Sequence, residues 1–187
     1  MDFLVIPTYK PDLTLIHLLQ RVKAKSSLHV VVVNDGSPAS YNSIFQEAQK
    51  CATILCYPSN QGKGQALKNA FTYIDTLGQY GTVVTADADG QHNVWDIFRV
   101  SKKAQENPNH LILGVRSFSG KVPLRSAFGN KVTRFLFQRQ TGVSVTDTQT
   151  GLRSFTTNMI PFMLEIEGQR YEYELNMLLS ASTKYPI

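Results

Sequence analysis

The sequence of 187 residues has little cysteine and no long hydrophobic run. Its two cysteines, Cys51 and Cys56, are too few to cross-link a domain of this size, and no paired C-x-x-C spacing suggests a zinc site. No stretch approaches the roughly 20 consecutive apolar residues that a membrane-spanning helix needs, and no basic leader precedes the apolar run at 3–6. These absences argue against a disulfide scaffold and a spanning helix, and they predict a reducing, cytoplasmic setting.

Acidic residues are missing from one part of the chain. The sequence has 19 Lys and Arg against 14 Asp and Glu, a formal net charge of +5. Between Asn107 and Thr146 there is no acidic residue, whereas six basic residues fall there: Arg116, Lys121, Arg125, Lys131, Arg134 and Arg139. The positive excess is therefore local, and it indicates either an anionic partner or a solvated basic face.

Apolar runs alternate with helical patterns along the first 115 residues. Strands are expected at 3–6, 28–33, 53–57, 81–86 and 110–115, with amphipathic helices between them, the first of which is capped by Asp12. This alternation predicts an α/β fold with a mainly parallel sheet flanked by helices on both faces. After residue 116 we expect an amphipathic helix at 128–139, a strand at 152–155 and helical patterns that end near Leu179.

Polar or glycine-rich segments follow each expected strand of the first 115 residues. They are Pro7-Thr8-Tyr9, Asn34-Asp35-Gly36-Ser37, Asn60-Gln61-Gly62-Lys63-Gly64, Asp87-Ala88-Asp89-Gly90-Gln91 and Gly114-Val115-Arg116. Because ligands of open parallel sheets bind where the strands end, we expect the chemistry of the protein in these loops.

Two carboxylates, Asp87 and Asp89, stand one residue apart after a buried strand. Like charges this close are costly unless a cation or a proton lies between them. Their hard oxygens suit Mg²⁺ or Mn²⁺, and Gln91 offers a further oxygen. Taken alone, the pair also fits a turn that caps the following helix. A calcium EF-hand is excluded because Phe98 stands where that loop requires glutamate.

The other loop motifs are weak one at a time. Gly62-Lys63-Gly64 has neither the phosphate-loop spacing nor the third glycine of a dinucleotide-binding turn, and it also reads as a plain helix start. Asn34-Asp35-Gly36-Ser37 is a common turn, although Asp35 is able to accept hydrogen bonds from a base or ribose. No Ser/His/Asp or Cys/His arrangement has convincing spacing, which argues against a covalent hydrolase.

Taken together and in order, these loops resemble the family 2 glycosyltransferases of the GT-A fold. The similarity is greatest to the branch of dolichyl-phosphate mannosyltransferases and bacterial polyprenyl-phosphate glycosyltransferases. It extends along nearly the whole chain through later features, namely Arg125 with Gly129-Asn130, Asp147-Thr148-Gln149-Thr150-Gly151-Leu152-Arg153 and Tyr171-Glu172-Tyr173-Glu174. The resemblance implies one GT-A domain over residues 1–187, with a nucleotide-binding part at about 1–115 and an acceptor-side part at about 116–187.

The resemblance also implies roles for individual residues. Those expected to bind the nucleotide are Pro7, Tyr9, Val33, Asp35, Lys63, Asp87 and Ala88. Asp87, Asp89 and Gln91 are expected to hold Mg²⁺ or Mn²⁺ on the donor's diphosphate, and Arg116 and Arg125 to contact phosphates. The residues assigned to catalysis are Asp89, Arg116, Arg125, Asp147 and Glu172. Many relatives have Asn-Glu where this chain has Lys10-Pro11, which leaves uracil and guanine open as the base.

The implied reaction is a metal-dependent, inverting transfer of a hexose from a UDP- or GDP-linked donor to a polyprenyl phosphate. An anionic lipid phosphate needs no strong general base, whereas a sugar hydroxyl of a cell-surface glycan would need Asp147, Glu172 or Glu174. Glu172 and Glu174 cannot both face inward from one helix. A non-catalytic nucleotide- or nucleic-acid-binding module is the alternative from another class. Nucleic acid is not expected, because the basic residues are few and aromatics are not interleaved with them.

The expected helix at 128–139 has an apolar side and a basic side. Its apolar stripe either packs in the core or rests with its lysines and arginines against an anionic membrane. Under the second alternative the protein is cytoplasmic and lies at the inner face of the cell membrane. The strand-like ending at 184–187 leaves open whether membrane segments follow in a longer protein.

Overall fold

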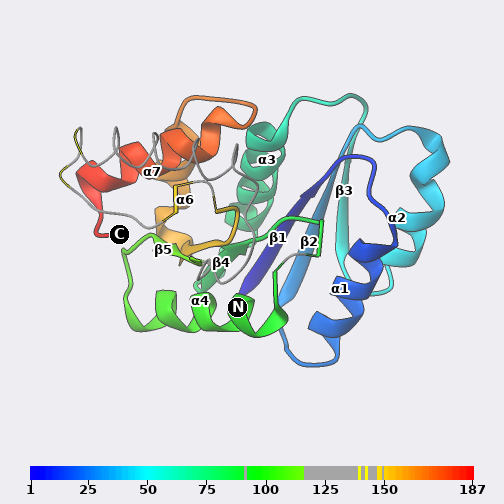
Figure 1. Ribbon diagram of the computed structural model, residues 1–187, viewed down its shortest axis with the longest axis horizontal. Helices are drawn as coiled ribbons and strands as arrows, with labels where there is room; N and C mark the ends of the chain where they lie inside the picture. Colours follow the sequence, from blue (N-terminus) through cyan, green and yellow to red (C-terminus); the bar gives the residue numbers. More distant parts are fainter. Residues whose placement is uncertain (91, 116–138, 140–141, 143–146, 149) are drawn as a thin grey trace, which may run out of the picture.

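The computed structural model describes residues 1–90, 92–115, 139, 142, 147–148 and 150–187. Its strands are β1 (Phe3–Thr8), β2 (His29–Asp35), β3 (Thr53–Tyr57), β4 (Thr82–Thr85), β5 (Ile112–Leu113) and β6 (Arg153–Thr156). Within the described residues they form one six-stranded sheet in the order β3-β2-β1-β4-β6-β5 (Figure 1). Strands β3, β2, β1 and β4 are parallel, so the expected mainly parallel α/β sheet is confirmed.

The strand expected at 152–155 is β6, although the sequence pattern did not predict its place in the sheet. It lies between β4 and β5 and runs antiparallel to both. The expected strand at 110–115 is reduced to the two residues of β5, which pair with β6 and not with β4. Beyond β5, Gly114 N donates to Leu152 O at 2.8 Å, and this bond continues the contact between the two segments.

The helices are α1 (Leu13–Lys23), α2 (Asn42–Ala48), α3 (Lys63–Thr76), α4 (Val94–Glu106), α6 (Ile160–Glu165) and α7 (Glu172–Lys184), with short 3-10 turns at Ala39–Tyr41 and Thr157–Met159. Helix α1 begins as expected, because the Asp12 carboxylate accepts from Thr14 N. Helix α7 runs past the expected end at Leu179, so Lys184 is helical. The strand-like ending is limited to the residues that follow, where Leu111 N donates to Pro186 O at 3.0 Å.

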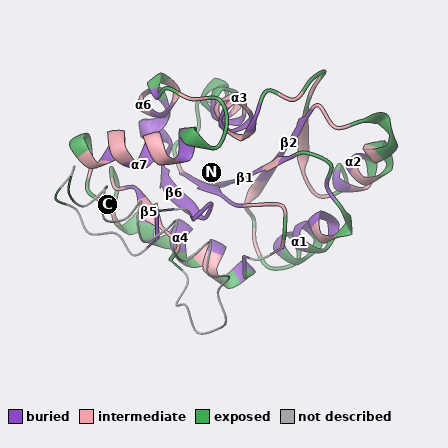
Figure 2. Cartoon of the chain, turned by 45° about the horizontal axis from the view of Figure 1, so that its top comes forward, coloured by how far each residue is buried: buried purple, intermediate pink, exposed green. Residues whose placement is uncertain are grey.

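Two hydrophobic cores lie on opposite faces of the sheet. Along β1, Phe3 and Val5 face the core covered by α3, α6 and α7, and Leu4 and Ile6 face the core covered by α1, α2 and α4. All four side chains are fully buried, and Figure 2 shows the central strands as the most buried part of the chain. The alternation follows from the period of two along a strand, so a sheet buried on both faces needs apolar residues at every position.

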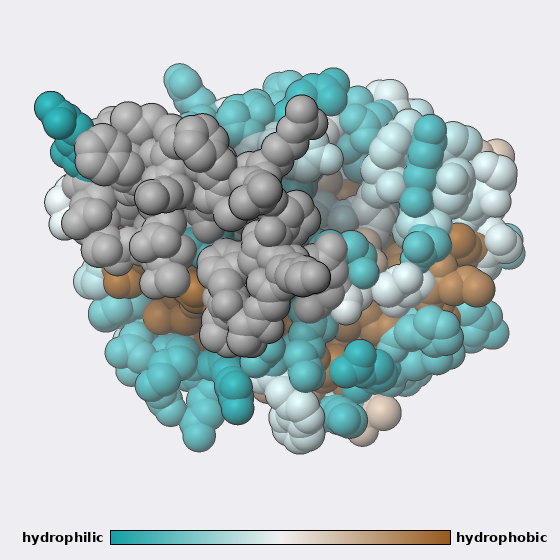
Figure 3. Space-filling model, in the orientation of Figure 1, coloured by the Kyte–Doolittle hydropathy of each residue, from teal (hydrophilic) through white to brown (hydrophobic). Residues whose placement is uncertain are grey.

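None of the described helices is both long and apolar enough to cross a membrane. On the face seen in Figure 3, hydrophilic side chains predominate and hydrophobic residues form smaller patches between them. The amphipathic helix expected at 128–139 lies outside the described residues, apart from Arg139.

Candidate active site

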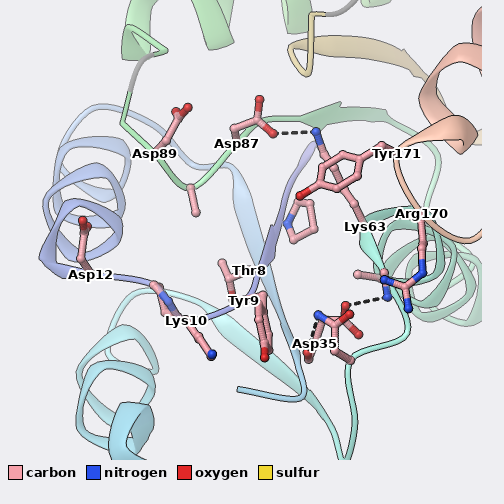
Figure 4. Close-up of a pocket in the computed structure, with 16 residues that line it drawn as sticks. Thr8, Tyr9, Lys10, Asp12, Asp35, Lys63, Asp87, Asp89, Arg170 and Tyr171 are labelled. Carbon is pink, nitrogen blue, oxygen red and sulfur yellow. Dashed lines mark hydrogen bonds and ion pairs between the residues drawn. The ribbon is translucent and has the colours of Figure 1, made fainter. Parts of the chain in front are cut away.

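A pocket of about 620 Å³ opens at the carboxyl ends of β1, β2 and β4 (Figure 4). This is the edge of the sheet where the strand-following loops were expected to meet. Seven residues that the sequence analysis assigned to donor or metal binding line the pocket: Pro7, Tyr9, Asp35, Lys63, Asp87, Ala88 and Asp89. Its volume falls in the range of small-molecule sites.

Val33 does not line this pocket. It is fully buried in β2 opposite Pro7 of β1, and its carbonyl accepts a hydrogen bond from Thr8 Oγ1 at 2.9 Å. The side chain therefore belongs to the core beneath the pocket. Its main chain supports the segment that leads into Tyr9.

Asp35 organises the loop before α3. Its two carboxylate oxygens accept from Gln61 N and Gly62 N, each at 2.8 Å, and the residue is 4% exposed. Gly62 adopts φ +104°, a conformation that a residue with a side chain rarely takes. A carboxylate oxygen has two lone pairs, so each oxygen of Asp35 retains capacity to accept from a ligand.

Lys63, the first residue of α3, joins two carboxylates from distant parts of the chain. Its Nζ lies 2.7 Å from Asp87 Oδ1, after β4, and 2.7 Å from Glu174 Oε2 on α7. Burial alone would lower the pKa of the Lys63 ammonium, but the charges and hydrogen bonds of Glu174 and Asp87 raise it. Lys63 is therefore a fixed positive charge at the floor of the pocket.

Asp87 stays ionised in this environment. Burial alone would raise its pKa, but the contact with His92 and the charge and hydrogen bond of Lys63 hold the pKa far below its usual value. His92 Nε2 lies 3.5 Å from Asp87 Oδ2. A methyl group on Gly151 would lie 2.3 Å from that same oxygen, so the absence of a side chain at Gly151 makes room for the carboxylate.

A fully buried arginine lies beneath this group of charges. Arg153 donates from Nε to Thr150 O at 2.9 Å, and its guanidinium also donates to the main-chain oxygens of Glu174 and Thr148. Burial lowers the pKa of Arg153, although the negative charge of Glu174 acts against this. Arg153 thus ties the segment that contains Asp147, which is buried, to α7.

The two glutamates at the start of α7 have different surroundings. Glu172 is exposed, and its Oε1 accepts from Gln169 N at 3.0 Å and Arg170 N at 3.1 Å, which lowers the pKa of its carboxyl group. Glu174 is buried beside Lys63, and its Oε1 has no hydrogen-bond partner among the described residues. Of the pair that the sequence could not separate, Glu174 is therefore the one that faces the site.

Two pocket residues were missed by sequence reasoning. Arg170 and Tyr171 lie between α6 and α7 and reach the pocket because Gln65 N of α3 donates to Gln169 O at 2.8 Å. Tyr171 was noted only as part of a motif, and Arg170 stands outside the acid-free basic stretch. The sequence feature that could have pointed to this loop is Gly168, because glycine permits the positive φ of +111° with which the chain turns before α7.

Three expected site residues, Gln91, Arg116 and Arg125, lie outside the described residues. In the described part of the chain, no group of three His, Cys, Asp or Glu side chains could hold a metal ion. Asp87 and Asp89 nevertheless fit Mg²⁺ or Mn²⁺ in chemical type. Mg²⁺ is usually bound by one or two carboxylates, with waters and substrate phosphates as the remaining ligands.

Comparison with solved structures supports the fold. The crystal structure of S. aureus TarS 1–349 superposes with a TM-score of 0.62 at 15% identity, covering 97% of this chain and 55% of the TarS 1–349 chain. A 4-diphosphocytidyl-2C-methyl-D-erythritol synthase superposes with a TM-score of 0.56 at 13% identity, covering 95% of this chain and 84% of the synthase. The expected GT-A fold is confirmed.

Similar sequences come from archaea and bacteria. A protein of Methanocaldococcus jannaschii, MJ1222, is 29% identical over 96% of this chain and 74% of its own length. The UDP-N-acetylglucosamine–dolichyl-phosphate N-acetylglucosaminyltransferase of Methanococcus voltae is 25% identical over 91% of this chain and 75% of its own length. The undecaprenyl-phosphate 4-deoxy-4-formamido-L-arabinose transferase of Shewanella sediminis is 26% identical over 88% of this chain.

This chain spans from about half to three quarters of the length of these curated relatives, with 51% for the Shewanella protein. The names of the Methanococcus voltae and Shewanella sediminis transferases match the branch that the sequence motifs resembled. The model of the family "Glycosyl transferase family 2" matches residues 3–166, which is most of the chain. With the pocket at the strand ends and the GT-A fold, this match means that the chain belongs to glycosyl transferase family 2 and is a glycosyltransferase.

Proposed function

We propose that this chain transfers a hexose from a UDP- or GDP-linked donor to a polyprenyl phosphate, with inversion at the anomeric carbon. The supporting observation is the pocket, which combines the acidic pair Asp87 and Asp89 with the fixed charge of Lys63 in a family 2 chain. Two similar proteins are named for transfer involving dolichyl phosphate and undecaprenyl phosphate. A lipid phosphate is accordingly the acceptor that we assign.

The donor would lie along the pocket from Asp35 to the acidic pair. We assign Pro7, Tyr9 and Asp35 to the nucleoside. Asp87 and Asp89 would hold Mg²⁺ or Mn²⁺, which when bound neutralises charge on the donor's diphosphate. Asp87 is suited to this because its low pKa keeps it ionised at neutral pH. Arg116 and Arg125 are assigned to the phosphates of donor or acceptor.

The proposed reaction is one displacement. An oxygen of the acceptor phosphate forms a bond to the anomeric carbon, the bond from that carbon to the diphosphate oxygen breaks, and the nucleoside diphosphate leaves with the electron pair. The acceptor oxygen is already anionic, so no residue has to remove a proton. The task of the chain is to position both substrates and to stabilise negative charge on the leaving group.

The surroundings of the acidic residues favour this acceptor over a glycan hydroxyl. A hydroxyl needs a carboxylate to take its proton, and Asp147, Glu172 and Glu174 are the candidates. Glu172 accepts from two main-chain amides, and Glu174 is paired with Lys63. Asp147 is buried. Transfer to a sugar hydroxyl remains the second candidate within the family.

The proposed acceptor is a membrane lipid, so we infer that the chain works at the inner face of the cell membrane. None of the described helices could span a bilayer, and we therefore expect peripheral contact through this part of the chain. Nucleic acid is disfavoured as a partner, because the pocket is lined by four carboxylates: Asp12, Asp35, Asp87 and Asp89.

The test is an incubation of the full-length protein with a labelled UDP- or GDP-hexose, Mg²⁺ and a short polyprenyl phosphate. We expect labelled sugar in the organic extract. The same polyprenol without its phosphate is the matched control acceptor and should give no product. Product from the polyprenol, or label that stays only in the aqueous phase, would contradict the assignment of the acceptor.

A further inference from the structure

Arg170 brings an unpaired positive charge to the pocket. It lines the cavity, and it forms no ion pair with any carboxylate in the described part of the chain. Lys63, by contrast, is held by Asp87 and Glu174. A guanidinium that is left unpaired in a pocket with several carboxylates is available to a ligand.

The main chain around Arg170 is fixed. Arg170 N and Gln169 N both donate to Glu172 Oε1, and Gln169 O accepts from Gln65 N in the first turn of α3. The guanidinium therefore extends from an anchored point beside the pocket. This reduces the conformational freedom that Arg170 would lose when a ligand binds.

Arg170 lies at the same end of the pocket as Asp35. The link between them is Gly62, whose N donates to Asp35 Oδ2 at 2.8 Å, while a methyl group on Gly62 would lie 2.6 Å from Arg170 Cγ. Figure 4 shows the guanidinium directed toward Asp35 and away from Asp87 and Asp89. Asp87 and Asp89 thus lie at one end of the pocket. At the other end Asp35, a hydrogen-bond acceptor, lies near Arg170, a hydrogen-bond donor.

We infer that Arg170 is a specificity-determining residue for the nucleobase, an inference that rests on the proposed nucleotide-sugar donor. In that complex Arg170 donates to a carbonyl oxygen of the base, and Asp35 accepts from the adjacent ring N–H. Uracil and guanine both carry a ring N–H next to a carbonyl oxygen. In cytosine and adenine the corresponding ring nitrogen carries no hydrogen, so Asp35 finds no donor there, and an amino group replaces the oxygen on C4 or C6, to which a guanidinium cannot donate. The site therefore selects oxo bases over amino bases.

The experiment is calorimetric titration of the full-length protein with UDP, GDP, CDP and ADP. We expect UDP or GDP to bind more tightly than CDP and ADP. In Arg170→Met, which keeps an unbranched side chain without donors, this preference should fall by about ten- to a hundredfold, the usual range for a direct base contact. Arg99→Met, on the exposed face of α4 and outside the pocket, is the matched control and should keep the preference.

Nucleosides separate a base contact from a phosphate contact. If Arg170 contacts the base, Arg170→Met weakens the binding of uridine or guanosine by the same factor as the binding of the corresponding diphosphate. A loss confined to ligands that carry phosphate, or an unchanged preference in Arg170→Met, overturns this inference and leaves the proposed function standing. If the wild-type protein binds none of the four nucleotides, the proposed donor class fails and the inference fails with it.

Discussion

Lys63 Nζ lies 2.7 Å from Oε2 of Glu174, which joins the first residue of α3 to the first turns of α7. Both side chains are largely buried, and the same ammonium also contacts Asp87. Buried ion pairs contribute little net stability as a unit, but removing one partner leaves an uncompensated charge. Removing Lys63 should therefore lower the stability of the protein by more than the intact ion pairs contribute to it.

We expect Lys63→Met to lower the free energy of unfolding by about 3 kcal/mol, because two carboxylates lose their common partner. Urea denaturation at neutral pH measures this. The matched control is Lys50→Met, which removes an exposed pair with Glu47 and should cost less than about 1 kcal/mol. Equal losses in the two variants would show that Lys63 does not compensate buried charge.

The pH dependence of stability should report Asp87. Its pKa in the folded protein lies far below the unfolded value of about 3.9, so its contribution is complete above about pH 4 and is lost as the pH falls through the folded pKa. Lys63 limits stability at the alkaline end instead. Because its pKa is raised in the folded protein, its contribution to stability is complete below about pH 10.4 and is lost as the pH rises through the folded pKa.

In Asp87→Asn this contribution is missing, so the variant should be less stable than wild type at pH 7. The difference should shrink as the pH is lowered below about 4, because Asp87 of the unfolded wild-type chain then takes up a proton while Asp87 of the folded protein is still charged. Urea unfolding midpoints across the acid range provide the measurement. A difference that stays constant down to the lowest pH would argue against a depressed pKa at Asp87.

Glu172 should act through the loop that carries Arg170. Glu172→Gln keeps an oxygen that accepts from Gln169 N and Arg170 N, so nucleotide affinity and turnover should stay close to wild type. Glu172→Ala removes that acceptor and should weaken nucleotide binding with little change in turnover at saturation. If Glu172→Gln loses turnover as fully as Glu172→Ala, Glu172 is a general base and the acceptor is a hydroxyl.

Gly151 gives a test of how closely Asp87 must be placed. The added methyl of Gly151→Ala would lie 2.3 Å from Asp87 Oδ2 and should push the carboxylate out of position. A misplacement of about 1 Å at a reaction centre costs on the order of a hundredfold in rate. Gly78→Ala is the control for activity, since no atom lies within 4 Å of the new methyl and Gly78 does not line the pocket; its φ of +60° means that the substitution costs some stability but should not change the rate. Full activity in Gly151→Ala would show that the placement of Asp87 is unimportant.

Metal removal should show that Asp89 is needed for sugar transfer and not for folding. We expect a chelator to abolish sugar transfer, Mg²⁺ or Mn²⁺ to restore it in the wild type, and neither to restore it in Asp89→Asn. The thermal unfolding temperature of the apoprotein should differ little between the two proteins. Full transfer by Asp89→Asn in the presence of metal would remove the assigned metal role.

Patterns of short range predicted much of the fold. The strand at 53–57 and the Asp12 cap follow from local rules, and the parallel arrangement brought Tyr9, Asp35 and Asp87 to one edge. The position of β6 was not predictable, because the four residues Arg153–Thr156 do not by themselves specify the neighbours or the direction of the strand. Antiparallel pairing with β4 depends on contacts between residues distant in sequence.

The carboxylates of the site differ in how far the sequence alone predicts their positions. Asp87 and Asp89 stand in a recognisable pair, whereas the partner of Lys63 is set by where α7 begins. Tyr173 decides this, because it is fully buried and its hydroxyl donates to Met163 O at 2.7 Å. That anchor turns Glu174 inward and leaves Glu172 in solvent, which a helical repeat alone could not choose.

The place of β6 in the sheet also bears on how the protein is synthesised. A nascent chain that has emerged only as far as β5 has made the four parallel strands but neither β6 nor helices α6 and α7. The sheet face that carries Phe3, Val5 and Val83 is then covered by α3 alone. Such a chain has an open strand edge at β4 and an uncovered apolar surface, the two features that promote aggregation. The domain should therefore complete its folding late, and truncation before α7 should give an insoluble product.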